Sequence, residues 1–329
     1  MRRHRTAAGI LLAVGTLFTG GLVQAGAADA APVATASGPS AAAHTASAAA
    51  QHKARTFWTA ARMRGATPLD LLLSERAATH LKAPKAHGSP TTVAPTPAPA
   101  LASFPQAGGP WTGGGAVATT SGRVFFTFQG RTASCTGNAV TSQNASTVIT
   151  AGHCVKYQGS WHTNWVFVPA YADGNAPYGQ WSAARTLTTP QWEASEDINY
   201  DVGAAVVAPL NGRTLTSVVG AQGIQFNGGY NKPMYSFGFP AAAPYDGTKL
   251  IYCSGNSSKD FLFSQDHGLG CNMTGGSSGG PWFTGFTEAA GTGLQVSVNS
   301  FGYTFLPNLM FGPYFGDVIK ALYDKAQAA

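Results

Sequence analysis

From Trp111 to its end, the chain is a succession of short apolar segments separated by glycine, proline and asparagine. Each segment is long enough for one strand, and residues that favour turns follow it; examples are VFFTF, WVFVPAY, DVGAAVVAPL, PMYSFGF and LQVSVNSFGY. The 329 residues include 41 glycines and 20 prolines, and only 10% are charged, which is typical of many turns and short strands. The sequence therefore predicts an all-β domain over residues 110–329, as one or two barrels or a sandwich.

One helix is expected at the C-terminal end of this domain. Asp317 is placed to cap the segment VIKALYDKAQ. Val318, Ile319 and Leu322 then fall on one face of the helix, which predicts that this face packs against the strands.

Residues 1–30 are typical of a secretory signal peptide. The basic start MRRHR precedes the apolar run GILLAVGTLFTGGLV, and Ala28–Ala30 form an A-x-A cleavage pattern. The run falls short of the roughly 20 residues that a membrane span needs, which argues against a retained anchor. We expect a secreted protein with no stable membrane association.

Residues 31–109 are rich in alanine, proline, threonine and serine and contain no cysteine. Within them, apolar residues between Phe57 and Leu81 predict a short helix or two, interrupted at Pro68. This composition cannot build much of a core. A pro-region or tether and a disordered spacer are both consistent with it.

The formal net charge of +6 does not indicate a nucleic-acid partner. Basic residues cluster at the N-terminus and between Lys53 and Lys85, with no basic stripe elsewhere.

Four cysteines fall within the β-rich segment, namely Cys135, Cys154, Cys253 and Cys271. An even number in a secreted chain predicts two disulfides. Of the three possible pairings we favour the one that is local in sequence, Cys135 with Cys154 and Cys253 with Cys271. A zinc site is the alternative, but the short C-x-x-C spacing is missing, and we expect no metal.

The segment CNMTGGSSGGPWF, residues 271–283, contains a candidate nucleophile, Ser278. A serine hydroxyl needs a base to remove its proton and a third group to orient that base. His153, in TAGHC directly after an apolar strand, is the candidate base. The other two histidines of the segment, His162 and His267, lie in loop-like sequence and are expected on the surface.

Asp201 is the candidate for the third group. It precedes an apolar, β-branched run, and a carboxylate at the edge of a core must find a hydrogen-bond donor such as an imidazole. Asp197 is the alternative, and as a turn residue it would be solvated. The glycines before the nucleophile permit an unusual turn, so that the N–H groups of Gly276 and Ser278 can form an oxyanion hole.

TAGHC, the Asp201 segment and GGSSGGP occur in the order His, Asp, Ser and resemble the active-site blocks of the chymotrypsin-like serine peptidases. The resemblance covers residues 109–329. It implies two antiparallel six-stranded β-barrels with the active site between them, a C-terminal helix, and a Cys135–Cys154 disulfide beside the histidine. It also implies that NSFGY, with Ser300, Phe301 and Gly302, pairs with the substrate backbone and forms one wall of the primary specificity pocket.

Two positions depart from the trypsin-type pattern. Ser277 stands where trypsin-type members have the aspartate that pairs with the new N-terminus, so the sequence is closer to the bacterial branch related to glutamyl endopeptidases. Asn272 falls at the floor of the specificity pocket, where it offers no charged partner. The glutamate-specific members use a histidine near the substrate-binding strand, and this chain has Asn299 and Ser300 there, which argues against strict glutamate specificity.

The sequence therefore predicts a secreted, monomeric serine endopeptidase that cleaves protein or peptide substrates through an acyl-enzyme on Ser278, without a cofactor. A lipase-type nucleophile elbow is disfavoured because its histidine follows the serine, and no histidine follows Ser278. A glycine–serine linker is disfavoured by the ordered segments on either side. A secreted binding protein on an inactive peptidase scaffold stays as the alternative.

Overall fold

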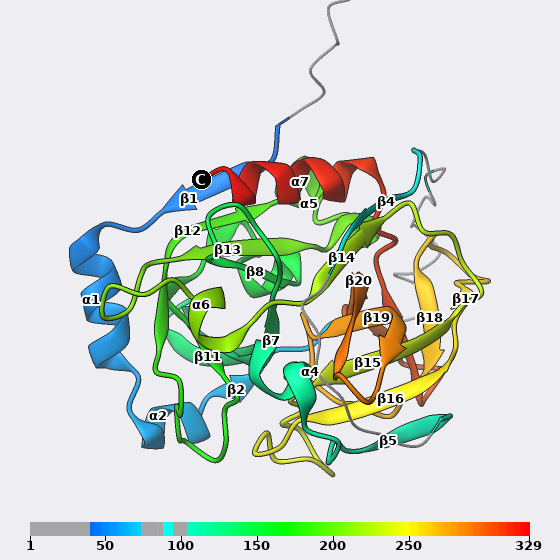
Figure 1. The fold of residues 1–329 in the computed structure, drawn as a ribbon, viewed down its shortest axis with the longest axis horizontal. Coiled ribbons are helices and arrows are strands. Elements are labelled where there is room, and N and C mark those ends of the chain that lie inside the picture. Colours follow the sequence, from blue (N-terminus) through cyan, green and yellow to red (C-terminus); the bar gives the residue numbers. More distant parts are fainter. Residues whose placement is uncertain (1–39, 74–83, 85–87, 95–103) are drawn as a thin grey trace, which may run out of the picture. The chain divides into compact units, whose positions relative to one another are not determined.

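The computed structural model describes residues 40–73, 84, 88–94 and 104–329, so the expected signal peptide and part of the expected pro-region lie outside it. Within the described residues, no helix is long and apolar enough to span a membrane. The architecture is mostly β, as expected (Figure 1).

Six strands close into an antiparallel barrel in the first half of the domain, because β12 pairs with both β11 and β13. These strands are β6 (Ser121–Phe128), β7 (Arg131–Ala139), β8 (Thr147–Thr150), β11 (Thr163–Pro169), β12 (Trp181–Thr188) and β13 (Gly203–Val207). The β6–β7 hairpin turns at Gln129 and Gly130, both with positive φ, the geometry that matches the twist of paired strands. Buried side chains such as Val124, Phe126 and Phe167 fill the barrel.

The second half distributes its strands over two sheets. The larger has the order β4-β14-β20-β19-β15-β16-β5 and the smaller β17-β18-β22. The strands of these two sheets are β4 (Thr91–Val93), β5 (Gln106–Pro110), β14 (Gly223–Phe226), β15 (Pro233–Gly238), β16 (Ile251–Asn256), β17 (Ser258–Lys259), β18 (His267–Gly270), β19 (Pro281–Thr287), β20 (Thr292–Val298) and β22 (Leu309–Gly312). The sheets meet where Phe301, just after β20, bridges to Phe311 in β22. Strand β5 spans the domain boundary expected at residues 109 and 110.

Short elements complete the domain. They are α4 (Gly115–Thr120), α5 (Pro190–Ser195), α6 (Thr216–Val219), the 3-10 turns η1 (Gly152–Cys154) and η2 (Ile198–Tyr200), the hairpin β9 (Lys156–Tyr157) and β10 (Ser160–Trp161), and β21 (Gly302–Tyr303).

The expected C-terminal helix is α7, Asp317–Gln327, and its Ile319 and Leu322 are buried in the barrel core. Val318 is only half-buried. Gly316, rather than Asp317, is the N-cap. The Asp317 carboxylate, in the first turn of the helix, instead accepts a hydrogen bond from the side-chain amide of Asn227. It therefore makes a tertiary contact and does not cap the helix.

The N-terminal segment 40–73 packs onto the domain, although its composition indicated little core. It contains β1 (Ala42–Thr45), α1 (Ala48–Phe57), α2 (Ala60–Arg64), β2 (Thr67–Pro68) and β3 (Leu72–Leu73). Helix α2 lies within the expected range and ends before Pro68, whereas α1 lies upstream of it. The hydroxyls of Ser47 and Thr59 accept hydrogen bonds from the first turns of α1 and α2. The part around Pro68 is extended and pairs with β7 and β21.

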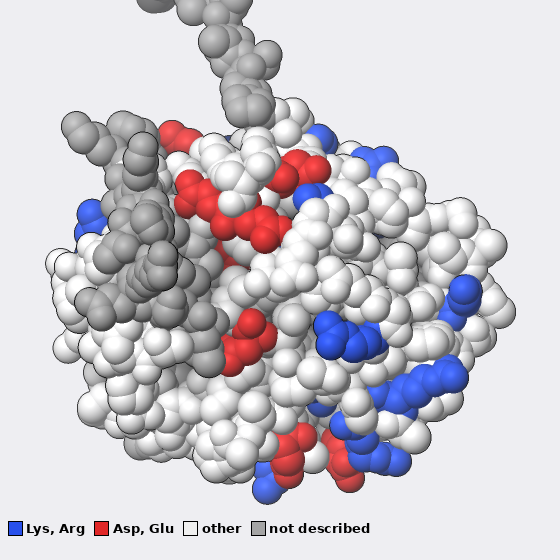
Figure 2. Space-filling view, turned by 180° about the vertical axis from the view of Figure 1, so that it is seen from behind, with Lys and Arg blue, Asp and Glu red and all other residues white. Residues whose placement is uncertain are grey.

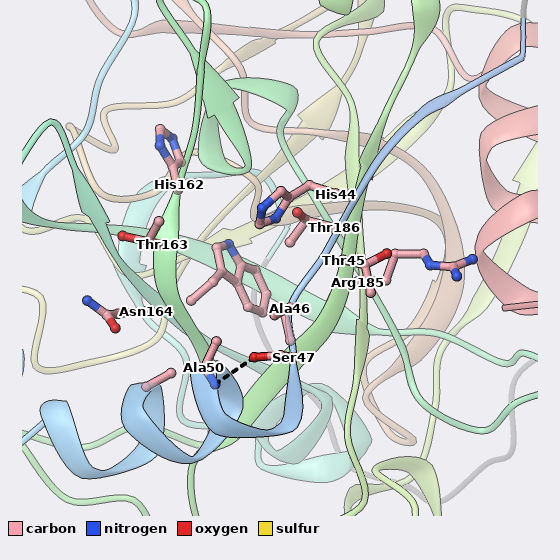
Figure 3. Close-up of a pocket in the computed structure, with 13 residues that line it drawn as sticks. His44, Thr45, Ala46, Ser47, Ala50, His162, Thr163, Asn164, Arg185 and Thr186 are labelled. Carbon is pink, nitrogen blue, oxygen red and sulfur yellow. Dashed lines mark hydrogen bonds between the residues drawn. The ribbon is translucent and has the colours of Figure 1, made fainter.

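Two contacts hold this segment against the first barrel. Strand β1 adds to β12, and Trp58, 2% exposed, packs on Phe125 and donates to the Asn164 carbonyl at 2.6 Å. A cavity of about 360 Å³ lies between this segment and strands β11 and β12, lined by residues such as His44, Ala50 and Thr186 (Figure 3). The packing there is incomplete, and none of the expected catalytic residues lines the cavity.

Charged side chains are unevenly distributed on one face of the molecule. Figure 2 shows most acidic groups in its centre and upper half and many basic groups toward its lower right, with a few acidic groups beside basic ones at the lower edge.

Candidate active site

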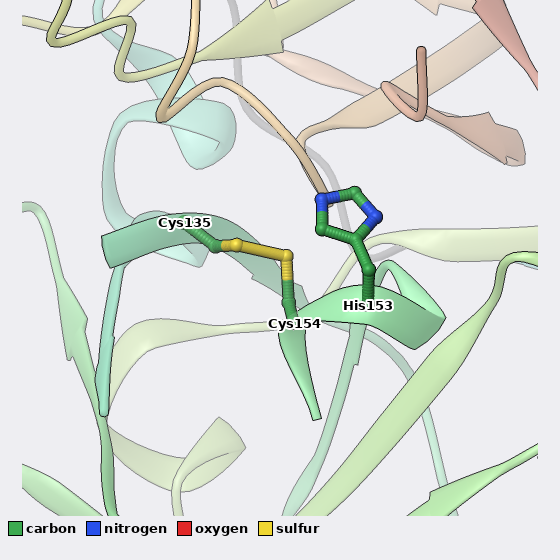
Figure 4. Close-up of side chains that lie close together, drawn as sticks. All are labelled: Cys135, His153 and Cys154. Carbon is green, nitrogen blue, oxygen red and sulfur yellow. A yellow bond between two sulfur atoms is a disulfide. The ribbon is translucent and has the colours of Figure 1, made fainter. Parts of the chain in front are cut away.

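His153 lies in η1, the turn that follows strand β8, and its position is fixed by a disulfide. Cys154 is bonded to Cys135 of strand β7 (Figure 4). The ligand-type atoms of these three residues lie within 4.8 Å of one another, but the two sulfurs are bonded to each other and offer no thiolate to a metal. The second expected disulfide, Cys253–Cys271, is also present.

Asp201 follows η2 and faces His153, as expected. Its Oδ2 lies 2.7 Å from His153 Nδ1, and its Oδ1 accepts the backbone N–H of His153 at 2.7 Å. Both side chains are fully buried. A third donor, the Ser300 hydroxyl, lies 2.6 Å from Oδ2. A carboxylate with these three donors fixes both the orientation and the tautomer of the imidazole.

Gly152 explains how the pair approaches so closely. A Cβ at this position would lie 2.9 Å from Asp201 Oδ1 and 2.9 Å from the Trp192 ring, closer than such atoms pack. The alternative partner, Asp197, instead accepts hydrogen bonds from the backbone and side chain of Asn199 at the start of η2.

Ser278 and Gly276 belong to the tight turn that enters strand β19. Gly276 has a φ of +93°, a backbone conformation that residues other than glycine rarely adopt. A Cβ at this position would lie 3.0 Å from the carbonyl oxygen of Phe239. Thr136 of the first barrel donates its backbone N–H to the Ser278 carbonyl at 2.7 Å and its hydroxyl to the Gly276 carbonyl at 2.9 Å. These hydrogen bonds from the first barrel therefore hold the turn in place across the interface between the two halves of the domain.

The carbonyl oxygen of Leu69 occupies this turn. It accepts the Gly276 N–H at 3.0 Å and the Ser278 hydroxyl at 3.4 Å. His153 Nε2 is buried and has no hydrogen-bond partner among the described residues. Ser278 thus points at Leu69 and not at the imidazole. Sequence reasoning missed Leu69, because nothing local marks a residue 209 positions before its partner.

The expected substrate-binding residues follow strand β20. Phe301 is buried, and Gly302 donates its N–H to the Leu71 carbonyl at 3.1 Å. Asn272 lies elsewhere, where it accepts the Tyr245 hydroxyl at 2.5 Å and donates its backbone N–H to the Ala107 carbonyl.

The expectation that His162 and His267 are surface residues is wrong, since both are buried. His162 stacks on Phe126, and its Nε2 donates to the His153 carbonyl at 2.8 Å. Burial lowers the pKa of His162 to about 4 and that of His267 to about 3. Their loop-like flanking sequences give no sign of the aromatic partners supplied by other parts of the chain, such as Phe126 of β6 beside His162 and Tyr314, after β22, beside His267.

Solved structures of bacterial proteases resemble this chain. Protease Anisep from Arthrobacter nicotinovorans is 46% identical, with a TM-score of 0.61, over 64% of this chain and 96% of that protein. The thermostable serine protease AL20, from an extremophilic microorganism, is 41% identical, with a TM-score of 0.61, over 65% of this chain and 99% of that one. A Glu endopeptidase, 16% identical with a TM-score of 0.54, shares the fold.

Among curated proteins, an extracellular metalloprotease of Bacillus subtilis (strain 168) is 37% identical over 82 residues, which are 25% of this chain and 25% of that protein. The chain thus spans about a quarter of the length of this curated relative. No protein-family profile matches the chain.

Proposed function

Because the chain belongs to the chymotrypsin-like serine proteases, as its likeness to Anisep and AL20 shows, we propose that it is a secreted endopeptidase whose nucleophile is Ser278. His153 is its general base, and Asp201 orients that base. The observation that carries the proposal is the convergence of the Gly276 N–H and the Ser278 hydroxyl on one carbonyl oxygen. In a serine peptidase, the nucleophile and the oxyanion donors lie beside the same carbonyl group, the hydroxyl oxygen near its carbon and the donors at its oxygen.

The reaction begins once the Leu69 carbonyl has left the turn. The Ser278 hydroxyl then donates to His153 Nε2, passes its proton to the ring and attacks the substrate carbonyl carbon. Asp201 stabilises the resulting imidazolium through Nδ1. The N–H groups of Gly276 and Ser278 bind the oxyanion.

The tetrahedral intermediate collapses when His153 gives this proton to the leaving amine, which breaks the peptide bond and leaves an ester on Ser278. A water molecule, deprotonated by His153, then hydrolyses the ester in the same way. The chain's own residues account for each proton in this cycle. The substrate is a protein or peptide whose backbone pairs with Gly302.

Export and processing belong to the same proposal. Residues 1–30 act as the signal peptide, and residues 31–109 are removed to give the mature, monomeric enzyme. Two observations support export: the relative from B. subtilis is named as extracellular, and both cysteine pairs form disulfides, which persist in oxidising compartments.

The test is intact-mass spectrometry of the secreted, processed protein after treatment with a serine-directed phosphonylating reagent, with Ser278→Ala as the control. We expect one adduct, mapped to Ser278 and missing from the control, and cleavage of casein by the unmodified protein. A folded, processed protein that forms no adduct would overturn the proposal in favour of a binding protein on a peptidase scaffold.

A further inference from the structure

The N-terminal segment crosses the proposed active site through contacts made mainly by its backbone. Leu69 donates its N–H to the Ser134 carbonyl at 3.0 Å on the first-barrel side. Its carbonyl accepts the N–H of Gly276, one of the proposed oxyanion donors, and the Leu71 carbonyl accepts the Gly302 N–H. The segment thus contacts both walls of the cleft and the nucleophile between them.

The direction of this crossing is opposite to that of a substrate. In a productive complex, the residues before the scissile bond pair with the Gly302 strand, and the leaving amine lies on the side of His153, which must protonate it. Here the residues before Leu69 pair with β7 on the His153 side, through Thr67 and Pro68. The residues after Leu69 pair with β21 on the Gly302 side.

Reversal has a chemical consequence at the Leu69–Asp70 bond. If Ser278 attacked the Leu69 carbonyl carbon, the bond that must break would release the Asp70 nitrogen toward Gly302. The proton taken up by His153 Nε2 would then lie on the wrong side of the adduct, and the amine could not leave as a neutral group. The oxyanion would instead restore the C=O double bond and expel the Ser278 oxygen, which recovers its proton from His153 Nε2.

We propose that residues 67–73 are a built-in inhibitor, bound in reverse so that they fill the oxyanion hole without being cleaved. This inference rests on the proposed function, since it concerns the regulation of the same site. It explains why the Ser278 hydroxyl and His153 Nε2 are not hydrogen-bonded to each other. With Ser277 in place of the aspartate, the chain cannot be activated by an ion pair to a new N-terminus, and removal of the inhibitor supplies another means of activation.

Leu71 holds the inhibitory residues 67–73 in place. It is 7% exposed and lies in an apolar cluster with Trp192, Ile198 and Phe301. Burial of this apolar side chain stabilises the bound position of the segment, and a carboxylate placed there would be desolvated without a partner. Thr67, in the same segment, is exposed, so a carboxylate there costs little.

The experiment follows phosphonylation of Ser278 in samples that contain both the unprocessed and the processed chain, which intact-mass spectrometry separates. We expect the unprocessed chain to react more slowly than the processed chain by about tenfold or more, because only the fraction with an open site reacts. Leu71→Asp should remove most of that difference, and Leu71→Ala part of it. Thr67→Asp, the matched control, should leave it unchanged.

Processing removes residues 67–73, so every variant yields the same mature protein, and its activity reports whether the precursor folded. Equal reactivity of the unprocessed and processed unsubstituted chains would overturn the inhibitor. A first cut at Leu69–Asp70, at a rate independent of protein concentration, would overturn the reversed direction. If neither form reacts, the proposed function itself fails, and with it this inference.

Discussion

On the first-barrel wall of the cleft, three hydrogen bonds hold Asp201 in place, and it in turn holds His153. On the opposite wall, the N–H of Gly276 and the hydroxyl of Ser278 both point at Leu69, a residue outside the peptidase domain. The proposed base is therefore positioned by the domain alone, whereas the Leu69 carbonyl of the N-terminal segment contacts the proposed nucleophile and one proposed oxyanion donor.

This difference indicates where control acts. A precursor can be kept inactive by distorting its catalytic groups or by filling its site. Because the His153–Asp201 pair is complete in the presence of the segment, removal of the segment needs no rebuilding of that wall. Substitutions on each wall should show separately how much that wall contributes to activity.

The largest effect is expected from Asp201→Asn, which disrupts the His153–Asp201 pair on the first-barrel wall. An asparagine amide favours the wrong imidazole tautomer, and kcat of the processed enzyme should fall by about 10⁴. Asp197→Asn is the control and should leave kcat close to that of the unsubstituted enzyme. Steady-state peptide hydrolysis measures both, and a larger loss at Asp197 would reverse the assignment.

Gly276→Ala distorts the turn on the opposite wall. The positive φ and the nearby Phe239 carbonyl leave no room for a Cβ, so the turn must shift and misdirect an oxyanion donor. We expect kcat to fall by about 10²–10³. Gly285→Ala is the control, since Gly285 also has a positive φ but has open space around it. Equal losses in the two variants would show that backbone strain alone is responsible.

Ser300→Ala sharpens the comparison, because it removes one donor from Asp201 and leaves two. A hydrogen bond to a charged group contributes about 1.5–3 kcal/mol, so kcat/KM should fall by about tenfold or somewhat more. The control is Ser297→Ala, a buried serine whose hydroxyl donates to the Pro313 carbonyl. A loss of activity as large in the control would assign the effect to packing.

The smallest effect at neutral pH is expected at His162. Its pKa in the fold, about 4, is below the ordinary 6.5 because burial disfavours the charged ring. The fold therefore prefers the neutral ring, and this contribution to stability is present above pH 6.5 and lost as the pH falls toward 4. The melting temperature should decline over this range, and less steeply in His162→Gln. Parallel curves would assign the decline to other groups, including His267.

Several features were predictable because short segments encode them. The blocks around His153, Asp201 and Ser278 carry the family resemblance, and both disulfides join cysteines that are close in sequence. The C-terminal helix was predictable from its period, although its cap was displaced by one residue.

The features that were missed depend on distant partners. The aromatic partners of His162 and His267 come from elsewhere in the chain, and the path of residues 67–73 depends on the strands that pair with its backbone. The helix of residues 48–57 was missed for a local reason. Its start is marked by Ser47, but the alanine-rich segment resembles a spacer in composition.

The hydrogen bonds of Thr136 have a mechanical consequence. This single residue of the first barrel bonds to the carbonyls of Gly276 and Ser278 and accepts the Phe239 N–H. A hinge motion between the two halves would have to break all three bonds before it could change the distance between His153 and Ser278. The two halves should therefore move as one rigid body around the nucleophile, and substrate entry should depend on the motion of surface loops and the N-terminal segment rather than on opening of the interface.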